Sequence, residues 1–264
     1  MTKNDGLGDE VLYELNGHVA TITYNRPERL NAINGPMRDG LNSAWSRFRD
    51  DPDAWVAIVT GSGRGFCAGA DLVDGQGATG TWSGTFWEIP THNSFESGWE
   101  IFKPTIAAVN GPCIGYGCTA VAACDFVIAS ERATFGFPEV KLGVPTIVGS
   151  IRMPGKIGWQ NAMELLMLGD SVDARRAKEM GFVWKVVEHE TLLDEANTLA
   201  ARLVARAPLA QRAIKEVAWR SRDLSFQEAV RFGETMRKVA AATDDAHEGR
   251  RAAAERRSPN WSGR

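Results

Sequence analysis

Three short runs of β-branched and small apolar residues constrain the fold of this chain most strongly. They span Trp55–Thr60, Pro104–Val109 and Phe126–Ala129. Such near-continuous apolar runs are typical of parallel strands that are buried on both faces of a sheet. The segment between the second and third runs, residues 115–124, is small and apolar, which predicts a buried helix. Strands that alternate with helices predict βαβ units, so we expect an α/β fold.

The two ends of the chain differ from this central part. Val11–Leu15 and His18–Tyr24 alternate polar and apolar residues on either side of Asn16-Gly17, a pair that suits the tight turn of a hairpin. From residue 159 onward, helical patterns dominate. We therefore expect an α/β core over residues 1–195 and a helical C-terminal region over residues 196–264.

Composition excludes several classes of protein. The chain has 264 residues, of which 44% are hydrophobic and 24% charged, as in ordinary globular proteins. Lys and Arg total 30 against 33 Asp and Glu, a formal net charge of −3, which gives no general reason to expect a nucleic acid as a partner. No run of about 18 apolar residues is present, so we expect no membrane span.

Cysteine and histidine usage indicates neither a metal site nor disulfides. The four cysteines form no CxxC pair, and the four histidines are scattered without an HExxH motif. The N-terminus is polar and lacks the apolar region of a secretory signal. We therefore expect no bound metal, reduced cysteines and a cytoplasmic location.

Familiar catalytic and phosphate-binding motifs are also missing. Gly61–Gly65 is rich in glycine, but it lacks both the GxGxxG spacing and the Lys-Ser/Thr pair of a phosphate loop. No GxSxG occurs, which argues against an α/β-hydrolase.

Two glycine-rich segments instead follow two of the predicted strands directly. They are Gly63–Leu72 and Asn110–Thr119. Ligands of open α/β folds bind just beyond the carboxyl ends of the strands, and glycine allows backbone to approach a ligand closely. Gly115-Tyr116-Gly117 opens the predicted helix, whose first N–H groups are free to donate. Each segment alone is equally compatible with an ordinary tight turn.

A long segment, residues 74–97, separates these parts of the chain. It combines Gly, Ser and Thr with Trp82, Phe86 and Trp87. Long loops in compact domains are usually functional or mobile, and the aromatic residues favour a lid or pocket wall over a solvated linker.

In order and spacing, the two glycine-rich segments together resemble the crotonase superfamily, also called the enoyl-CoA hydratase/isomerase family. Asn25–Ala32 is similar to its N-R-P-x-x-L-N-A element, and Phe135–Gly143 to its F-x-x-P-E-x-x-x-G element. The C-terminal residues 257–264 are similar to its usual tail. The resemblance covers nearly the whole chain and implies a crotonase-like ββα-repeat core with a helical C-terminal region.

The resemblance also implies a reaction on acyl-CoA thioesters. Two backbone N–H groups would stabilise a thioester enolate, and the matching residues are Ala70 and Tyr116. Glu139 matches a catalytic glutamate of the family. The other glutamate of the hydratases falls at Thr119, which is a departure from the pattern. Coenzyme A would enter as part of the substrate, so no separate cofactor is expected.

Further residues match the positions that contact coenzyme A in the family. Asp71, Leu72 and Val73 match the stretch that holds the adenine, and Arg29 and Leu30 match the path of the pantetheine arm. The substrate-binding set implied by the resemblance is Arg29, Leu30, Ala68, Ala70, Asp71, Leu72, Val73 and Tyr116. A surface charge in contact with water is the plain alternative for Arg29.

The loss of one glutamate leaves two reactions open. A single carboxylate suits moving a proton between carbons of one substrate, which is double-bond isomerisation. Hydration needs a second group to orient water. Thr119 could hold a water by hydrogen bonding, and Glu88 or Glu96 could supply a second carboxylate.

Other functions and the assembly also follow from the resemblance as expectations. Decarboxylases and other lyases of the superfamily share the oxyanion hole, and some members bind RNA without catalysis. Only the C-terminal arginines gather positive charge, so RNA binding is the weaker alternative. The helical C-terminal region packs against neighbouring subunits in the family, which predicts a homotrimer or a hexamer built from trimers.

Overall fold

The computed structural model describes residues 7–73 and 94–264. Its main sheet has the strand order β1-β2-β3-β4-β6-β9. β1 and β2 form the predicted antiparallel hairpin, and every later neighbour pairs in parallel. The strands are β1 (Val11–Asn16), β2 (Val19–Tyr24), β3 (Val56–Gly61), β4 (Thr105–Val109), β6 (Phe126–Ser130) and β9 (Lys185–Val187).

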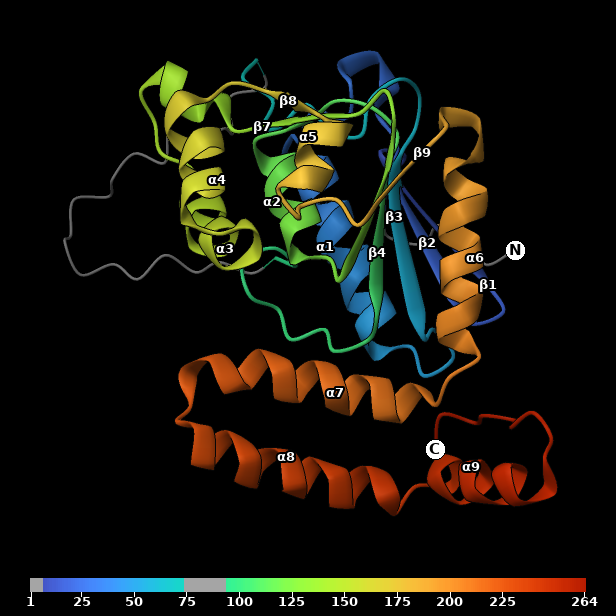
Figure 1. Cartoon of the computed structure of the whole chain (residues 1–264). Helices are drawn as coiled ribbons and strands as arrows, with labels where there is room; N and C mark the ends of the chain where they lie inside the picture. The colour runs from blue at the N-terminus through green and yellow to red at the C-terminus, as the bar shows by residue number, and fades with distance from the viewer. Residues whose placement is uncertain (1–6, 74–93) are drawn as a thin grey trace.

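Helices cover both faces of this sheet (Figure 1). α6 (Leu192–Val204) lies on one face, and α1 (Gly35–Asp50) and α2 (Tyr116–Ala123) lie on the other. The alternation within β4 explains why both faces are apolar. Ile106 and Ala108 pack in the cluster under α6, while Ala107 and Val109 join the larger core on the opposite side. The α/β fold expected from the buried strands is therefore confirmed.

A second, three-stranded sheet was not anticipated from the sequence. It has the order β5-β7-β8, formed by β5 (Cys113–Ile114), β7 (Thr134–Gly136) and β8 (Val172–Asp173). β5 pairs in parallel with β7, and β8 closes the sheet in antiparallel orientation. Strands of two or three residues carry too little alternation to be recognised in a sequence.

Helix α3 (Ile147–Ile157) was also missed, because Gly149 and Pro154 weaken its pattern. The helical pattern expected from residue 159 onward begins with α4 (Trp159–Met163), which is followed by a π-helical turn at Glu164–Leu168. A 3₁₀ turn, Pro138–Leu142, connects β7 to the segment before α3. The remaining helices are α5 (Ala174–Glu179), α7 (Pro208–Arg220), α8 (Phe226–Ala241) and α9 (Asp244–Glu255).

The C-terminal helices extend away from the sheet, below it in Figure 1. α7 and α8 form an antiparallel pair, and α9 continues beyond them. Lys215 of α7 ties the pair to the core, since its Nζ donates to the carbonyl of Lys103 at 2.9 Å and to Asp125 at 2.7 Å. Residue 196, the expected domain boundary, falls within α6. No helix in the described residues is long and apolar enough to cross a membrane.

Candidate active site

Two asparagine side chains hold the first glycine-rich segment in place. Asn31 Nδ2 donates to the carbonyl oxygens of Ser62 at 3.0 Å and Gly65 at 2.8 Å. Asn110 Nδ2 donates to the carbonyl of Gly63 at 3.0 Å. Both amides bind backbone that leaves β3, so the loop is fixed before any ligand arrives. Sequence reasoning placed both residues within motifs but assigned neither a role.

The second glycine-rich segment runs directly beside the first. The backbone N–H of Cys67 donates to the carbonyl of Pro112 at 3.0 Å, and that of Ile114 donates to the carbonyl of Cys67 at 2.8 Å. At Gly69, φ is +95°, and a β-carbon there would lie 3.2 Å from the carbonyl oxygen of Ile114 and 3.9 Å from the nitrogen of Tyr116. Glycine therefore lets the two backbones meet beside Tyr116.

Both of the backbone donors implied by the resemblance are open. Tyr116 is the first residue of α2, so its N–H has no acceptor within the helix. Ala70 lies opposite Ile33, but the hydrogen bonds there use the neighbouring carbonyl of Gly69 and N–H of Asp71, at 2.8 and 2.9 Å. Across residues 7–73 and 94–264, neither N–H has a hydrogen-bond partner. Two such donors beside one another can stabilise an oxygen that gains negative charge.

Glu139 is brought to these donors by the small sheet. The parallel pairing of β5 with β7 continues into a hydrogen bond from the N–H of Gly115 to the carbonyl of Gly136, at 2.8 Å. The Pro138–Leu142 turn starts two residues later and carries Glu139. At Gly115, φ is +54°, and a β-carbon would stand 2.8 Å from Glu139 Oε1. Only glycine leaves room for this carboxylate.

The surroundings of Glu139 favour the protonated form. Its Oε2 is buried and has no hydrogen-bond partner among the described residues. Burial of the half-buried side chain raises the pKa of this carboxyl above its ordinary value. A carboxyl whose pKa is moved toward neutrality exchanges protons with carbon acids more effectively than an ordinary surface glutamate.

Thr119, at the position of the missing glutamate, is only 5% exposed. Its Oγ1 donates to the carbonyl of Gly115 at 3.3 Å, one turn earlier in α2. The hydroxyl is therefore engaged with its own helix, as is common for a threonine inside a helix. This position supplies no carboxylate to the site.

Glu96 is the one of the two suggested carboxylates that lies within the described residues. It is 6% exposed, and its Oε1 accepts a hydrogen bond from Ser94 Oγ at 2.5 Å. Burial raises the pKa of the Tyr116 hydroxyl well above its ordinary value, and the neighbouring charge of Glu96 raises it further. Glu96 is thus a buried carboxylate beside the residue that carries the second donor. Glu88, like Trp82, Phe86 and Trp87 of the expected lid, lies outside the described residues.

The residues expected to hold coenzyme A occupy different environments. The carboxylate of Asp71 forms a buried ion pair with Arg26 at 2.5 Å, and it also accepts the N–H of Val73 at 2.9 Å. Leu72 and Val73 follow with exposed side chains, at 71% and 76%. The Asp71 side chain is thereby committed within the protein, which leaves its backbone and its two neighbours to contact a ligand.

On the pantetheine side, the expected residues are adjacent to each other. The N–H of Ala68 donates to the carbonyl of Leu30 at 2.9 Å, and the Leu30 side chain packs near Gly65. Leu30 has φ of +50°, which is unusual for a branched residue. Arg29 is exposed. The structure therefore brings Arg29 and Leu30 to the edge of the first glycine-rich segment.

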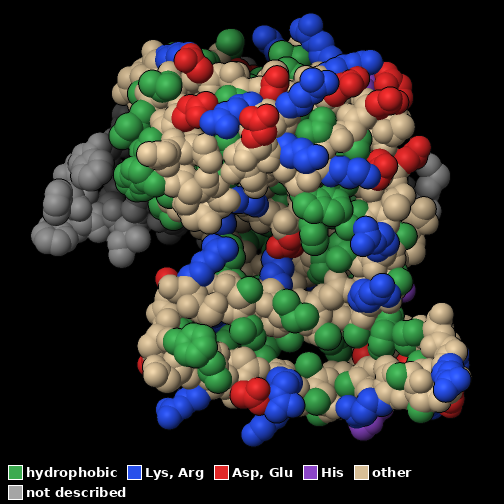
Figure 2. Space-filling view, in the orientation of Figure 1, with side chains coloured by type: hydrophobic (Ala, Val, Ile, Leu, Met, Phe, Trp, Pro, Cys, Tyr) green, Lys and Arg blue, Asp and Glu red, His purple; other side chains and the backbone are tan. Residues whose placement is uncertain are grey.

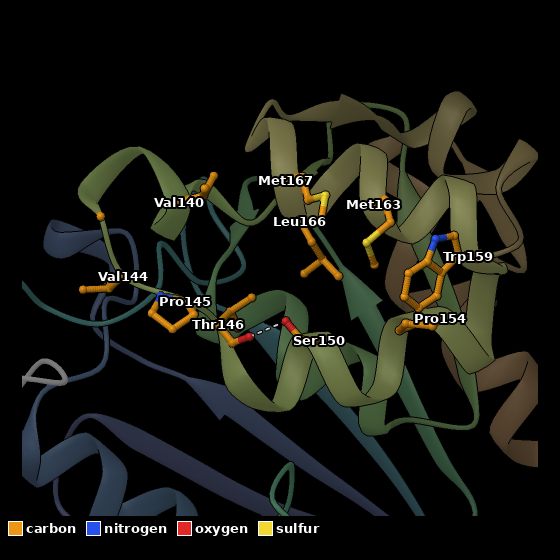
Figure 3. Close-up of a pocket in the computed structure, with 11 residues that line it drawn as sticks. Val140, Val144, Pro145, Thr146, Ser150, Pro154, Trp159, Met163, Leu166 and Met167 are labelled. Carbon is orange, nitrogen blue, oxygen red and sulfur yellow. Dashed lines mark hydrogen bonds between the residues drawn. The ribbon is translucent and has the colours of Figure 1, made fainter.

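An apolar chamber of about 720 Å³ lies near these residues without including them. Figure 3 shows it between the Pro138–Leu142 turn, α3 and the α4 region. Val140 lines it, whereas the preceding Glu139 lies against Gly115. Its walls are Val140, Gly143, Val144, Pro145, Thr146, Ser150, Pro154, Trp159, Met163, Leu166 and Met167. None of the described residues that line the chamber is charged.

Several charged side chains elsewhere are paired with one another. Lys and Arg are interspersed with Asp and Glu on the face of the core in Figure 2. At the C-terminus, Glu248 accepts hydrogen bonds from both Arg251 and Arg257, and Arg257 also pairs with Glu255 at 2.6 Å. Part of the basic cluster is therefore neutralised internally. Among the described residues, no group of three or more His, Cys, Asp and Glu side chains could hold a metal.

The fold and the two open backbone donors beside a desolvated glutamate define a crotonase-type α/β enzyme. Residues 14–264 match the family model for enoyl-CoA hydratase/isomerase, and the chain belongs to this family. It is accordingly an enzyme of the enoyl-CoA hydratase/isomerase type.

Named relatives and solved structures agree with this membership. The chain is 34% identical to (E)-benzylidenesuccinyl-CoA hydratase from Thauera aromatica, over 96% of this chain and 99% of the relative. It is 38% identical to carnitinyl-CoA dehydratase from Salmonella arizonae, over 94% and 96%. The crystal structure of enoyl-CoA hydratase from Mycobacterium tuberculosis H37Rv superposes with a TM-score of 0.88, at 36% identity over 97% of this chain and 100% of that chain. These likenesses support the enzymatic interpretation and not a non-catalytic, RNA-binding one.

Proposed function

We propose that this protein moves a proton between carbons of an enoyl-CoA thioester, with Glu139 as the acid–base group. The observation that carries the proposal is the carboxylate of Glu139, which has a buried, unpartnered oxygen and lies against Gly115 at the start of α2. Thr119 stands where a second carboxylate would be needed for ordinary hydration. One proton-exchanging group fits double-bond isomerisation best.

The proposed reaction balances without any other reactant. Glu139 removes a proton from the α-carbon of a 3-enoyl thioester, and the electron pair of that C–H bond forms the enolate. The N–H groups of Ala70 and Tyr116 bind the enolate oxygen. The same carboxyl then returns its proton to the γ-carbon, which leaves a 2-enoyl thioester. Loss of one such donor typically raises a barrier by about 3 kcal/mol.

Hydration is the second candidate, and a specific observation keeps it open. Glu96 is a buried carboxylate beside Tyr116, oriented by Ser94. A second carboxylate near the donors could hold the water that adds to the β-carbon of a 2-enoyl thioester. The relatives named as hydratases are consistent with this alternative.

Product analysis separates the two reactions. The protein is incubated separately with a 2-enoyl-CoA and a 3-enoyl-CoA, and products are identified by mass and absorbance. Isomerisation converts the 3-enoyl thioester without a change in mass, whereas hydration adds the mass of one water to the 2-enoyl thioester. Conversion of neither substrate would refute the proposal.

Coenzyme A binding and assembly belong to the same proposal. The exposed Leu72 and Val73, with Arg29, would line the path of coenzyme A, which arrives as part of the substrate.

The C-terminal helices would join subunits into a trimer or a hexamer. This is supported by α8, in which no residue is buried although Phe226 and Val230 are apolar. A cytoplasmic location is supported by the four free, buried cysteines.

A further inference from the structure

Arg38 carries a charge that nothing in the described protein pairs. Its Nε atom is buried and has no hydrogen-bond partner. The guanidinium makes no ion pair or ring contact within residues 7–73 and 94–264. The two later arginines of the same helix do have partners, since Arg47 lies over the ring of Tyr13 and Arg49 pairs with Asp50 at 2.7 Å. A partly buried guanidinium without a hydrogen-bond partner destabilises the folded protein unless a ligand supplies that partner.

The backbone places Arg38 close to the proposed oxyanion donors. Arg38 lies in the first turn of α1, where its N–H donates to the carbonyl of the cap residue Asn34 at 3.1 Å. The residue before the cap, Ile33, is hydrogen-bonded to both neighbours of Ala70. Arg38 therefore lies five residues, roughly 7 Å at the helical rise per residue, beyond the residue that is hydrogen-bonded to the segment with the first donor.

Its helix face points toward Glu96 and Tyr116. Arg38 and Trp45 are seven residues apart and so lie on the same face of α1. Trp45 stacks on the ring of Phe95 with the centroids 3.8 Å apart, and Phe95 precedes Glu96. The positive charge of Arg38 also lowers the pKa of Tyr116 slightly against the larger effect of burial.

A second arginine, Arg152, contacts the backbone of Glu96. Glu96 contributes one negative charge, and its backbone carbonyl accepts a hydrogen bond from Arg152 Nε at 2.8 Å. Arg152 is further held over the ring of Trp219 at 5.1 Å. An anion bound beside Arg38 would supply the partner that its buried Nε lacks among the described residues.

The enzyme's thioester substrate can supply that anion from its acyl part. The expected path of coenzyme A runs over the exposed Arg29, Leu72 and Val73, whereas Arg38 lies on the side of the partly buried Tyr116 and the buried Glu96. We propose that Arg38 binds a carboxylate at the far end of the acyl chain, so that the preferred substrates are CoA thioesters of unsaturated dicarboxylic acids. Guanidinium–carboxylate hydrogen bonds are among the strongest in proteins. This inference rests on the proposed function.

Binding of saturated thioesters tests the inference without requiring turnover. Succinyl-, glutaryl- and adipyl-CoA are compared with butanoyl-, pentanoyl- and hexanoyl-CoA by calorimetry, so that each acid has a neutral partner of the same chain length. We expect the native protein to bind at least one acid about tenfold or more tightly than its neutral partner. Arg38→Gln should abolish that preference and leave the neutral affinities within about twofold. Arg38→Lys, which keeps the charge, should restore part of it.

Arg49→Gln on the same helix serves as the matched control and should keep the preference for the acid over its neutral partner. Thermal melting confirms that each variant is folded. The inference is overturned if no acid binds more tightly than its neutral partner, or if Arg38→Gln keeps the preference. Equal weakening of acids and neutral thioesters would also overturn it, since Arg38 would then act on the shared thioester or coenzyme. If neutral thioesters bind and react, the proposed function survives that failure. If no thioester binds at all, the proposed function fails as well.

Discussion

The carboxylate of Glu139 lies where a side chain on Gly115 would have to be: a β-carbon at Gly115 would stand 2.8 Å from Glu139 Oε1. The two residues come from separate motifs, joined by the hydrogen bond between Gly115 and Gly136. Because Gly115 also precedes the donor Tyr116, one position controls both the carboxylate and the start of α2. This relationship provides a sharp test of the site.

Gly115→Ala should displace Glu139 and strain the backbone. The added methyl group meets the carboxylate, and φ of +54° is unfavourable for alanine, at a cost of about 1–3 kcal/mol. We expect turnover to fall at least tenfold, with a lower melting temperature. Gly155→Ala in α3 is the control, since nothing lies within 4 Å of its β-carbon position. That variant should melt no lower than the native protein and keep its turnover. Full activity in Gly115→Ala would show that Glu139 does not act from this position.

Glu139→Gln tests the pKa of the carboxyl through stability. Burial raises the pKa of Glu139 in the folded protein, so the folded state retains a proton that the unfolded state has lost. The native protein should therefore lose stability relative to Glu139→Gln as pH rises from below 4.5, the ordinary pKa, through the raised folded value. Denaturant unfolding at pH 4 and pH 7 measures the difference. If the native protein instead gained stability relative to Glu139→Gln as pH rises, the folded protein would favour the carboxylate.

Thr119→Glu should raise the hydration of a 2-enoyl-CoA, because it restores a carboxylate three residues after the second donor. Thr119→Gln has nearly the same shape without the charge and is the matched control. Both larger side chains enter a buried position, where overpacking could cost roughly 1–3 kcal/mol, so melting temperatures are recorded alongside the rates. If the native protein already hydrates as fast as Thr119→Glu, Glu96 becomes the first residue to replace, with Glu96→Gln.

The buried ion pair between Arg26 and Asp71 should be structural. Asp71→Ala removes the shortest contact of the buried Arg26 guanidinium, which keeps Glu10 at 3.4 Å, and we expect it to cost about 1.5–3 kcal/mol of unfolding free energy. Arg132→Ala, which removes an exposed pair with Glu190, should change stability very little. A full-stability Asp71→Ala variant with weakened coenzyme A binding would instead assign the carboxylate to the ligand.

The assembly prediction concerns the apolar side of α8. Light scattering of the native protein at micromolar concentration should report a trimer or a hexamer. Phe226→Asp, which places a charge at a side chain that is 81% exposed in the single chain, should weaken that assembly without unfolding the core. A stable native monomer would contradict the prediction.

The sequence was sufficient to predict the α/β core because its strands are long and continuously apolar. The two glycine-rich segments of the site were also recognisable, since each follows a predicted strand directly. The pairing of β5 with β7 could not be predicted, because two or three residues carry no periodic signal. Yet that pairing is what carries Glu139 to Gly115.

The environments of individual side chains could not be predicted from the sequence pattern either. Asp71 matched a ligand-binding stretch, but its partner Arg26 is 45 residues away and no local rule links them. In the sequence, Arg38 is one of three arginines between residues 38 and 49. Only the packing around Phe95 and Tyr116 distinguishes it from Arg47 and Arg49.

Proton transfer by Glu139 is the central claim, and exchange with solvent tests it most directly. The native protein and Glu139→Gln are incubated with a 3-enoyl-CoA in D₂O, and double-bond position and deuterium content are followed by NMR and mass spectrometry. We predict that the native protein forms the 2-enoyl isomer and incorporates deuterium at the α- or γ-carbon. The variant should be slower by about a hundredfold or more while still binding coenzyme A thioesters. Isomerisation and deuterium incorporation at native rates in Glu139→Gln would contradict the account.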